Sequence, residues 1–261
     1  MTDFKKNGLV IHENDYGEND KLLVILTERY GKIPVIAKGA KSVRNRHMAC
    51  CQLFTYASFN FRKKGNFYYI TESDLIESYY DIRTDIVKVA LASFICDVIN
   101  DVCQEGNNDD VILRLALNTL FAIAKNTKPL EFIRACFEMR IASELGYSPN
   151  IEYCKKCGNK LVDNIYLDII DGVAQCEKCK STYIKESTDP FSERGLEKPV
   201  AIISESVSLA IQYVCLCRQE RFLSFTLDES EYPSFFSVCE RFLLHQLERS
   251  FYSLEFYKTM L

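Results

Sequence analysis

The spacing of apolar residues changes once along this 261-residue chain, from every second position to every third or fourth position. The alternating part covers about the first 80 residues and is typical of β-strands with one buried face. The wider spacing that follows is typical of amphipathic helices. We therefore predict an α+β chain with more than one domain, in which a β-domain is followed by a helical domain.

Five short strands fit the alternating part. They are rich in β-branched residues, and turn signals such as Asp15-Tyr16-Gly17 and the Lys63–Asn66 hairpin separate them. The expected strands are Leu9–Ile11, Leu22–Leu26, Ile33–Ala37, Leu53–Phe61 and Phe67–Thr71. Five strands of this length suit a small closed barrel, so an OB-fold-like barrel is predicted first and an SH3-like barrel second.

Helical stripes account for most of the remaining chain. The apolar positions of five expected helices are Val87, Leu91, Phe94, Ile95, Val98 and Val102; Leu113, Leu117, Leu120, Phe121 and Ala124; Ile133, Phe137, Ile141 and Leu145; Val207, Ala210, Ile211 and Val214; and Phe235, Cys239, Phe242, Leu243 and Leu247. We predict domains at 1–79 for the barrel, at 80–150 with 182–261 for the helices, and at 151–181 for an insertion.

The insertion contains two Cys-x-x-Cys pairs, Cys154/Cys157 and Cys176/Cys179, separated by eighteen residues. Zinc prefers four tetrahedral ligands, and each short spacing lets one tight turn present two thiolates to the same ion. The spacing predicts one structural Zn²⁺, with Ile165–Ile170 forming a strand or hairpin beside it. Four thiolates leave no open position for activating water, which argues against a zinc hydrolase or deaminase. A ribbon that touches nucleic acid is the alternative role.

Basic residues are concentrated in one stretch, although the chain as a whole has a formal net charge of −4. Between Arg29 and Thr71 there are nine Lys and Arg and no Asp or Glu. Three interpretations compete: a solvated face, a membrane-surface patch, and a nucleic-acid interface. A membrane patch usually uses a basic amphipathic helix, whereas this stretch has strands and loops.

Interleaved aromatic residues favour nucleic acid, because small barrels that bind single strands combine a positive groove with aromatic faces on which bases stack. These aromatics are Phe54, Tyr56, Phe59, Phe61, Phe67, Tyr68 and Tyr69. Alternation allows only one face to be exposed, and the sequence leaves open which one. The candidate DNA-binding cations are Lys32, Lys38, Lys41, Arg44, Arg46, Arg62, Lys63 and Lys64.

Catalytic motifs are missing from the sequence: it has no Walker P-loop, no glycine-rich dinucleotide fingerprint and no His-Glu-x-x-His. The acidic residues Asp81, Asp85, Asp109 and Asp110 suit helix starts instead. We therefore predict a binding protein and no enzyme. The sequence also has no apolar run of about 18 residues and no secretory signal at its start, and Cys pairs suited to a metal indicate a reducing compartment, so the cytoplasm is expected.

Residues 8–42, GLVIHENDYGENDKLLVILTERYGKIPVIAKGAKS, resemble the opening of the bacterial RecO family of recombination mediators. The segments CQLFTYASFNF, ELGYSPNIEYCKKCG and FLLHQLERSFYSLEFY match the same family in kind and order. The resemblance spans essentially the whole chain. It implies an N-terminal OB-fold, a helical C-terminal domain and a zinc module.

The resemblance also implies a function. The family binds single- and double-stranded DNA, anneals complementary strands, and acts with RecR to load RecA onto gaps coated by single-stranded DNA-binding protein, in the bacterial cytoplasm at the nucleoid. Its DNA-binding surface corresponds here to Lys38, Lys41, Arg44 and Arg46. The helical domain is expected to bind the acidic, apolar C-terminal tail of the single-stranded DNA-binding protein, with the candidate cations Arg134, Arg140, Arg218 and Arg221. Two alternatives stay open: an OB-plus-zinc module that acts on RNA or in transcription, and a scaffold whose barrel binds protein.

Overall fold

The computed structural model describes residues 3–65, 67–180 and 200–261. The chain divides into two compact units, Met1–Leu130 with Phe251–Leu261, and Glu131–Ser250. These units reflect packing and do not test where independently folding domains begin. The predicted domain boundaries therefore stay predictions, and the boundary between 181 and 182 lies outside the described residues.

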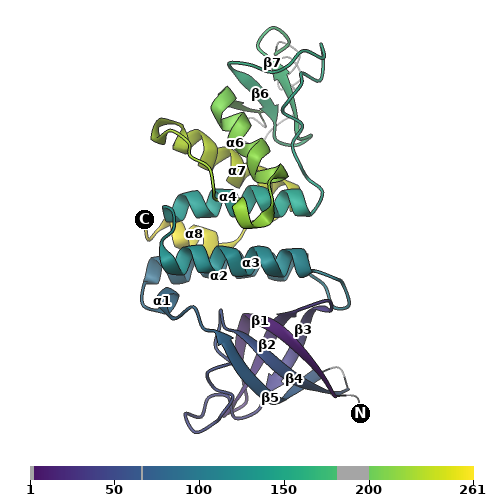
Figure 1. The fold of residues 1–261 in the computed structure, drawn as a ribbon, viewed down its shortest axis with the longest axis vertical. Coiled ribbons are helices and arrows are strands. Elements are labelled where there is room, and N and C mark those ends of the chain that lie inside the picture. Colours follow the sequence, from purple (N-terminus) through teal and green to yellow (C-terminus); the bar gives the residue numbers. More distant parts are fainter. Residues whose placement is uncertain (1–2, 66, 181–199) are drawn as a thin grey trace, which may run out of the picture. The chain divides into compact units, whose positions relative to one another are not determined.

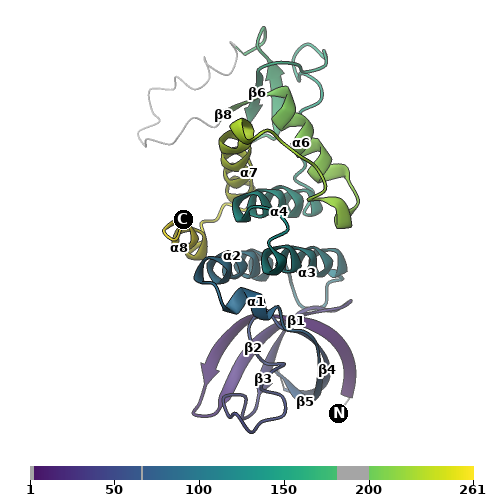
Figure 2. The same cartoon turned by 60° about the vertical axis from the view of Figure 1, so that its left-hand side comes forward.

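The first unit begins with a closed five-stranded barrel, visible in Figures 1 and 2. Its strands are β1 (Asp3–Tyr16), β2 (Asp20–Thr27), β3 (Gly31–Ala37), β4 (Tyr56–Lys64) and β5 (Phe67–Glu77), in the order β1-β2-β3-β5-β4. β1 pairs antiparallel with both β2 and β4, and a parallel pairing of β3 with β5 completes the ring. This arrangement confirms the predicted OB-like barrel.

The long strand β1 bridges both neighbours because it bends. Its register with β2 shifts between Val10 and His12, and such a bulge bends a strand and increases its twist. The fourth strand begins at Tyr56 and not at Leu53 as expected. Phe54 has a φ of 66°, a left-handed conformation that cannot continue a strand.

The barrel core is formed by the inward side chains of alternating positions. On β4 these are Ala57, Phe59 and Phe61, all with 0% exposure, which settles the question of the buried face that the sequence had left open. Tyr68 of β5 joins them at 1% exposure. The rings of Phe59 and Phe61 lie 5.5 Å apart, so aromatic packing fills much of the interior.

The described helices of the first unit are α1 (Tyr80–Arg83), α2 (Ile86–Val102), α3 (Asp110–Lys125) and α8 (Tyr252–Lys258). The carboxylate of Asp85 caps α2 by accepting from the amides of Val87 and Lys88, as its position at a helix start predicted. The stripe predicted for α3 is wrong at Phe121, which is 51% exposed. Leu115, Ala116 and Ile123 are buried there instead, because the helix turns a neighbouring face to the core.

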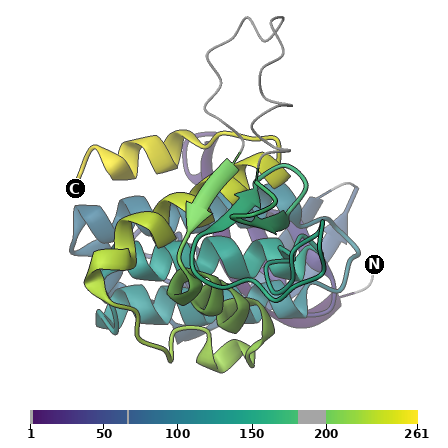
Figure 3. The ribbon, with the colours of Figure 1, turned by 90° about the horizontal axis from the view of Figure 1, so that it is seen from above.

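The C-terminal segment packs on α2, as Figure 3 shows in yellow. The rings of Phe251 and Phe94 lie 5.7 Å apart, and the Ser253 hydroxyl donates to the carboxylate of Asp97 at 2.6 Å. The chain therefore returns to its first unit after completing the second.

The second unit contains the helices α4 (Leu130–Glu144), α6 (Glu205–Leu216) and α7 (Tyr232–Gln246), with the 3-10 turns η1 (Gln219–Arg221) and η2 (Glu229–Glu231). Its sheet has the order β7-β6-β8, formed by β6 (Ile165–Asp168), β7 (Val173–Cys176) and β8 (Val200–Ile203). The β6–β7 hairpin confirms the strand expected near Ile165. β8 was not predicted, although its four residues are all apolar.

Across the described part of the chain, no helix combines the length and the apolar character needed to cross a bilayer.

Candidate nucleic-acid interface and metal centre

The eight predicted cations come from three places on the barrel: β3, the loop 38–55 between β3 and β4, and the end of β4. The loop is braced by Asn45, whose amide donates to the Lys38 carbonyl at 2.7 Å and accepts from the His47 amide at 2.8 Å. Val43 and Arg44 are exposed at its tip. The basic loop therefore has a defined shape with an exposed apex.

Lys32 does not face the same surface as the loop cations. Its ammonium group donates to both the carbonyl and the side-chain oxygen of Asn100, the latter at 3.2 Å. Asn100 lies in the last turn of α2, where carbonyl groups carry partial negative charge. Lys32 therefore ties the barrel to a helix end, a role that sequence alone did not suggest.

Three further cations form ion pairs with carboxylates from outside the acid-free stretch. Arg62 forms a two-pronged pair with Asp3, with N···O distances of 2.9 and 2.7 Å. Lys41 lies 3.2 Å from Asp15, and the ammonium of Lys63 lies 3.9 Å from Glu105. Tyr68 links this last pair, because its hydroxyl accepts from Lys63 at 3.0 Å and donates to Glu105 at 2.9 Å.

Asp3, Asp15 and Glu105 are the ion-pair partners of these cations that sequence reasoning missed. No sequence signal pointed to them, because Asp3 and Asp15 lie more than ten positions before the basic stretch and Glu105 lies beyond it. Only the strand pairing and the loop packing bring them beside the cations. All three pairs are substantially exposed, so each contributes little stability, about 0–1 kcal/mol, and can exchange partners.

Three of the eight predicted cations remain available to bind an anion. Lys38, Arg44 and Lys64 are exposed and have no carboxylate partner within ion-pair distance among the residues that the structure describes. Arg46 is also exposed, with its guanidinium donating to the Thr71 carbonyl at 3.0 Å. The free positive charge is therefore concentrated in the loop and at the end of β4.

The barrel divides the predicted aromatic residues between its two faces. Phe54, Phe59, Phe61 and Tyr68 are buried, so the expectation that they stack on bases is excluded by packing. Tyr56 is half-buried and donates to the Glu28 carboxylate at 2.8 Å. Phe67 and Tyr69 remain, half-buried on the outer side of β5.

Phe67 and Tyr69 lie two positions apart on β5, so their side chains share one face of the strand. Cations lie beside both of them. In the pairing of β4 with β5, Lys64 lies opposite Phe67 and Arg62 lies opposite Tyr69. The ammonium group of Lys38 lies over the Tyr69 ring, 5.6 Å from its centre. We call Lys38, Arg44, Arg46, Lys64, Phe67 and Tyr69 the basic face.

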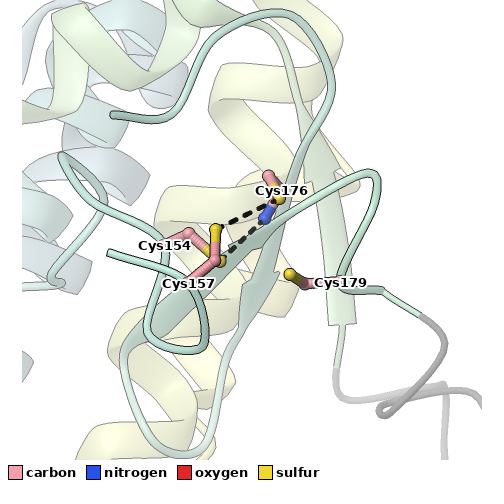
Figure 4. A group of neighbouring side chains, drawn as sticks. All are labelled: Cys154, Cys157, Cys176 and Cys179. Atoms are coloured by element: carbon pink, nitrogen blue, oxygen red, sulfur yellow. Dashed lines mark hydrogen bonds between the residues drawn. The ribbon is translucent and has the colours of Figure 1, made fainter. Parts of the chain in front are cut away.

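The four predicted metal ligands converge in the second unit (Figure 4). The sulfur atoms of Cys154, Cys157, Cys176 and Cys179 all lie within 4.8 Å of one another. Those of Cys157 and Cys176 are 3.9 Å apart. A tetrahedral zinc site with Zn–S bonds of about 2.3 Å has sulfur–sulfur distances of about 3.8 Å. The donor set and its spacing therefore fit a tetrahedral metal ion.

Local backbone structure prepares the first thiol for metal binding. The Cys154 sulfur accepts from the Cys176 amide at 3.4 Å. Burial raises the pKa of the Cys154 thiol, but the amides of Cys176, Cys157 and Lys156 outweigh burial and lower this pKa to about 6. Hydrogen bonding with Cys176 raises the pKa of the Cys179 thiol to about 12. Metal binding requires deprotonated thiols, so a metal ion bound here would displace protons.

Cations near the thiolates are partly engaged elsewhere. Lys155 lies 3.6 Å from Asp171, and Lys180 donates to the Tyr166 hydroxyl at 3.0 Å while pairing with Glu177 at 3.1 Å. Lys155 and Lys180 therefore have their own partners beside the four cysteines.

The cations proposed for the tail of the single-stranded DNA-binding protein fall into two groups. Arg134 is 3% exposed and contacts the carboxylates of Glu131, Glu138 and Glu240. Arg140 is 8% exposed and donates to the carbonyls of Val214, in the last turn of α6, and of Cys217, just after that helix. Both are fully committed to internal contacts. Arg218 and Arg221, at the start and the end of the turn after α6, are exposed.

Comparisons with known proteins agree with this architecture. The family described as Recombination protein O N terminal matches residues 1–79, and Recombination protein O C terminal matches residues 83–199. The DNA repair protein RecO of Acetivibrio thermocellus is 32% identical over 261 residues, which is 100% of this chain and 98% of the relative. The protein of the same name from Alkaliphilus metalliredigens is 27% identical over 257 residues, covering 98% of this chain and 99% of the relative.

The matches run through both compact units, and they include the barrel and the four cysteines. The relative from Acetivibrio thermocellus aligns along the full length of the chain. The resemblance found in the opening strands and the cysteine pairs is thereby confirmed, and this chain belongs to the RecO family of DNA repair proteins.

Proposed function

We propose that this chain is a recombination mediator without enzymatic activity. It binds single- and double-stranded DNA, anneals complementary strands, and acts with RecR to load RecA onto gaps coated by single-stranded DNA-binding protein. Its place is the bacterial cytoplasm, at the nucleoid. Family membership supports this role, and the observation that carries it is the basic face, where free cations flank two outward aromatics.

The proposed mechanism uses only binding. Lys38, Arg44 and Lys64 neutralise phosphates, and Phe67 and Tyr69 stack on bases, each stack contributing about 1–3 kcal/mol. Phosphate contacts fix the position of a strand without reading its sequence. Two strands whose charges are screened on one surface can therefore pair with each other. No nucleotide is hydrolysed.

An annealing assay tests this function. Two complementary oligonucleotides, free or coated with single-stranded DNA-binding protein, are mixed with the full chain in the absence of nucleoside triphosphates. We expect faster annealing that weakens with salt, and loss of the effect when Lys38, Arg44 and Lys64 are changed together to Ala. The control Lys125→Ala, whose cation on α3 pairs with Asp81, should anneal like the wild type. No acceleration at low salt, or a requirement for a triphosphate, overturns the proposal.

The same preparation separates the alternatives. Stronger binding to single-stranded RNA than to DNA favours a module acting on RNA or in transcription. Absence of any nucleic-acid binding at low salt favours a scaffold whose barrel binds protein.

For the cysteine site we propose one structural Zn²⁺. Soft thiolate ligands in a set of four select zinc among common divalent ions, and a closed set contributes folding energy and no catalysis. The four converging sulfurs support this identity. Metal analysis of protein purified without added metal should find about one zinc per chain; iron in its place would reject the assignment.

For the second unit we propose a site for the acidic, apolar tail of the single-stranded DNA-binding protein. A hollow of about 330 Å³ lies beside α6, and its lining includes Leu209, Tyr213 and Phe225. The Tyr213 hydroxyl donates to the Arg221 carbonyl at 3.2 Å, which places the exposed cation segment next to this hollow. Apolar side chains beside exposed cations suit a tail that carries both apolar and acidic groups, although the Asp228 carboxylate also lines the hollow.

Titration of the full chain with the tail peptide tests this site. We expect saturable binding that Arg221→Ala weakens, whereas Lys160→Ala, an exposed cation in the cysteine region, leaves it unchanged. Equal effects of both variants would place the tail elsewhere. Binding to RecR is a separate expectation from family membership, and pull-down with purified RecR tests it.

A further inference from the structure

A second hollow lies on the outside of the barrel and contains no residue of the basic face. It has a volume of about 450 Å³, within the range of pockets that hold small organic groups. Six polar residues line it: Asp3, Lys5, Asn60, Arg62, Thr71 and Glu72. They come from β1, β4 and β5, with β4 in the middle.

Strand register explains why these side chains meet. Asp3 lies opposite Arg62, and Asn60 lies opposite Glu72 on the other side of β4. The register of β4 with β5 shifts between Asn60 and Phe61, so Thr71 is an extra residue on β5. Its hydroxyl donates to the Asn60 carbonyl at 3.2 Å. A bulge of this kind bends the strand and re-aims its side chains, which opens the hollow.

The charges around the hollow cancel. The lining holds two cations and two carboxylates: Arg62 pairs with Asp3, the amide of Asn60 donates to Glu72 at 2.6 Å, and Lys5 pairs with Asp74 outside the hollow. A phosphate gains nothing from a neutral site that presents two carboxylates. A neutral planar group with both donors and acceptors on its edge is matched by the guanidinium, amide and carboxylate groups present here.

The hollow adjoins the basic face. Arg62 lies opposite Tyr69, and Arg46 donates to the carbonyl of Thr71, which is the bulged residue. A strand whose phosphates contact the loop and whose bases stack along Phe67 and Tyr69 therefore passes the mouth of the hollow. We propose that this hollow is a nucleobase subsite, which receives one unpaired base from single-stranded DNA bound on the basic face. The subsite rests on the proposed function and adds a base preference to it.

The side chains in the hollow predict which base is preferred. The Glu72 carboxylate can only accept, and the exocyclic amino group of cytosine is a donor that carboxylates read. Thymine has a carbonyl oxygen at the same position, which a carboxylate repels. Cytosine is therefore favoured over thymine, by the worth of about one hydrogen bond, or about three- to tenfold in affinity.

Binding of oligo(dC) and oligo(dT) of about 15 nucleotides to the full chain tests the subsite, because these pyrimidine strands carry equal charge. We expect tighter binding of oligo(dC) by the wild type. Glu72→Gln should reduce that ratio to about one, since an amide can donate as well as accept. The matched control is Asp74→Asn, an exposed acid on the same strand that pairs with Lys5 at 3.8 Å and does not line the hollow. Asp74→Asn should keep the ratio.

Each outcome decides between the two proposals. Equal binding of the two strands by the wild type, with salt-sensitive affinity intact, overturns the subsite and leaves the DNA interface standing. An equal change of the ratio in both variants assigns it to bulk charge and also overturns the subsite. Failure of both strands to bind rejects the DNA interface, and the subsite with it.

Discussion

Gly31 lies so close to the backbone of Gln104 that a β-carbon on Gly31 would be 1.9 Å from the Gln104 carbonyl oxygen. Gly31 begins β3, and Gln104 belongs to the connection between α2 and α3. The amide of Gly106 donates to the Tyr30 carbonyl at 3.0 Å, and the amide of Arg29 donates to the Asp110 carboxylate at 2.6 Å. The β2–β3 turn is therefore held in place by hydrogen bonds to the α2–α3 connection and to the start of α3.

Gly31→Ala should destabilise the first unit strongly. The φ of +65° already disfavours a side chain, by about 1–2 kcal/mol, and the clash adds a further 1–3 kcal/mol, roughly, by displacing backbone. Urea unfolding measures the loss. Gly17→Ala is the matched control, because Gly17 has a φ of +63° and a β-carbon added there would meet no atom within 4 Å. Equal losses in the two variants would show that the close approach has no energetic weight.

Removing free cations of the basic face should flatten the salt dependence of DNA binding. Each lost phosphate contact lowers the slope of log K against log salt by about 0.7 for single-stranded DNA. Arg44→Ala combined with Lys64→Ala should therefore reduce it by about 1.4, equally for unrelated sequences. Lys125→Ala should leave the slope unchanged. A slope that responds to Lys125 as strongly as to Arg44 would place the interface elsewhere.

Neutralising a carboxylate that forms an ion pair with one of the predicted DNA-binding cations should strengthen DNA binding. Asp15→Asn releases Lys41, and because an exposed pair is worth about 0.2–1 kcal/mol, affinity should rise by up to about fivefold. Glu18→Gln removes the same charge from the same turn, where Glu18 is exposed and forms no ion pair among the described residues. A gain that is no larger than the Glu18→Gln gain would mean that only net charge matters.

Loss of one thiolate should release the metal and lower stability, because metal-binding energy is also folding energy. We expect Cys176→Ser to lose most of its zinc and to melt at least about 5 °C lower. Cys217→Ser serves as the control, since Cys217 lies after α6 and apart from the four ligands. Full metal content in Cys176→Ser would remove this residue from the ligand set.

Stability should fall with rising pH because of Glu138. Complete burial raises the pKa of Glu138 from 4.5 to about 8, although the charge of Arg134 opposes this shift. Between these values the folded state binds more protons than the unfolded state, so the free energy of unfolding decreases as pH rises, by up to about 1.4 kcal/mol per pH unit. Glu138→Gln should lose this dependence and be more stable than the wild type near pH 9.

The control for this prediction is Glu144→Gln on the same helix. Glu144 is partly exposed and pairs with Arg140 at 2.7 Å, so its replacement should leave the pH dependence in place. Parallel pH profiles for the wild type and Glu138→Gln would mean that Glu138 is ionised in the folded protein.

Local patterns predicted the elements well where a single face is buried. The alternation along β4 puts Ala57, Phe59 and Phe61 on one face, because side chains of a strand point to opposite faces with a strict period of two, but only packing decided that this face is the buried one. Phe121 was misplaced on α3, since several neighbouring stripes of that helix are apolar and only packing selects among them. β8 was missed because its partner strand β6 is more than thirty residues away, beyond the reach of local periodicity.

The sequence by itself determined the barrel, the helices and the four cysteines that converge as candidate metal ligands, because strand alternation, helical spacing and the short Cys-x-x-Cys turns are local properties of the chain. Tertiary structure alone decided which cations are free. Arg62, Lys41 and Lys63 look identical to Arg44 and Lys64 in the sequence, but strand pairing and loop packing bring Asp3, Asp15 and Glu105 to the first three. Charge acts through space, and the distances that set it exist only once the chain has folded.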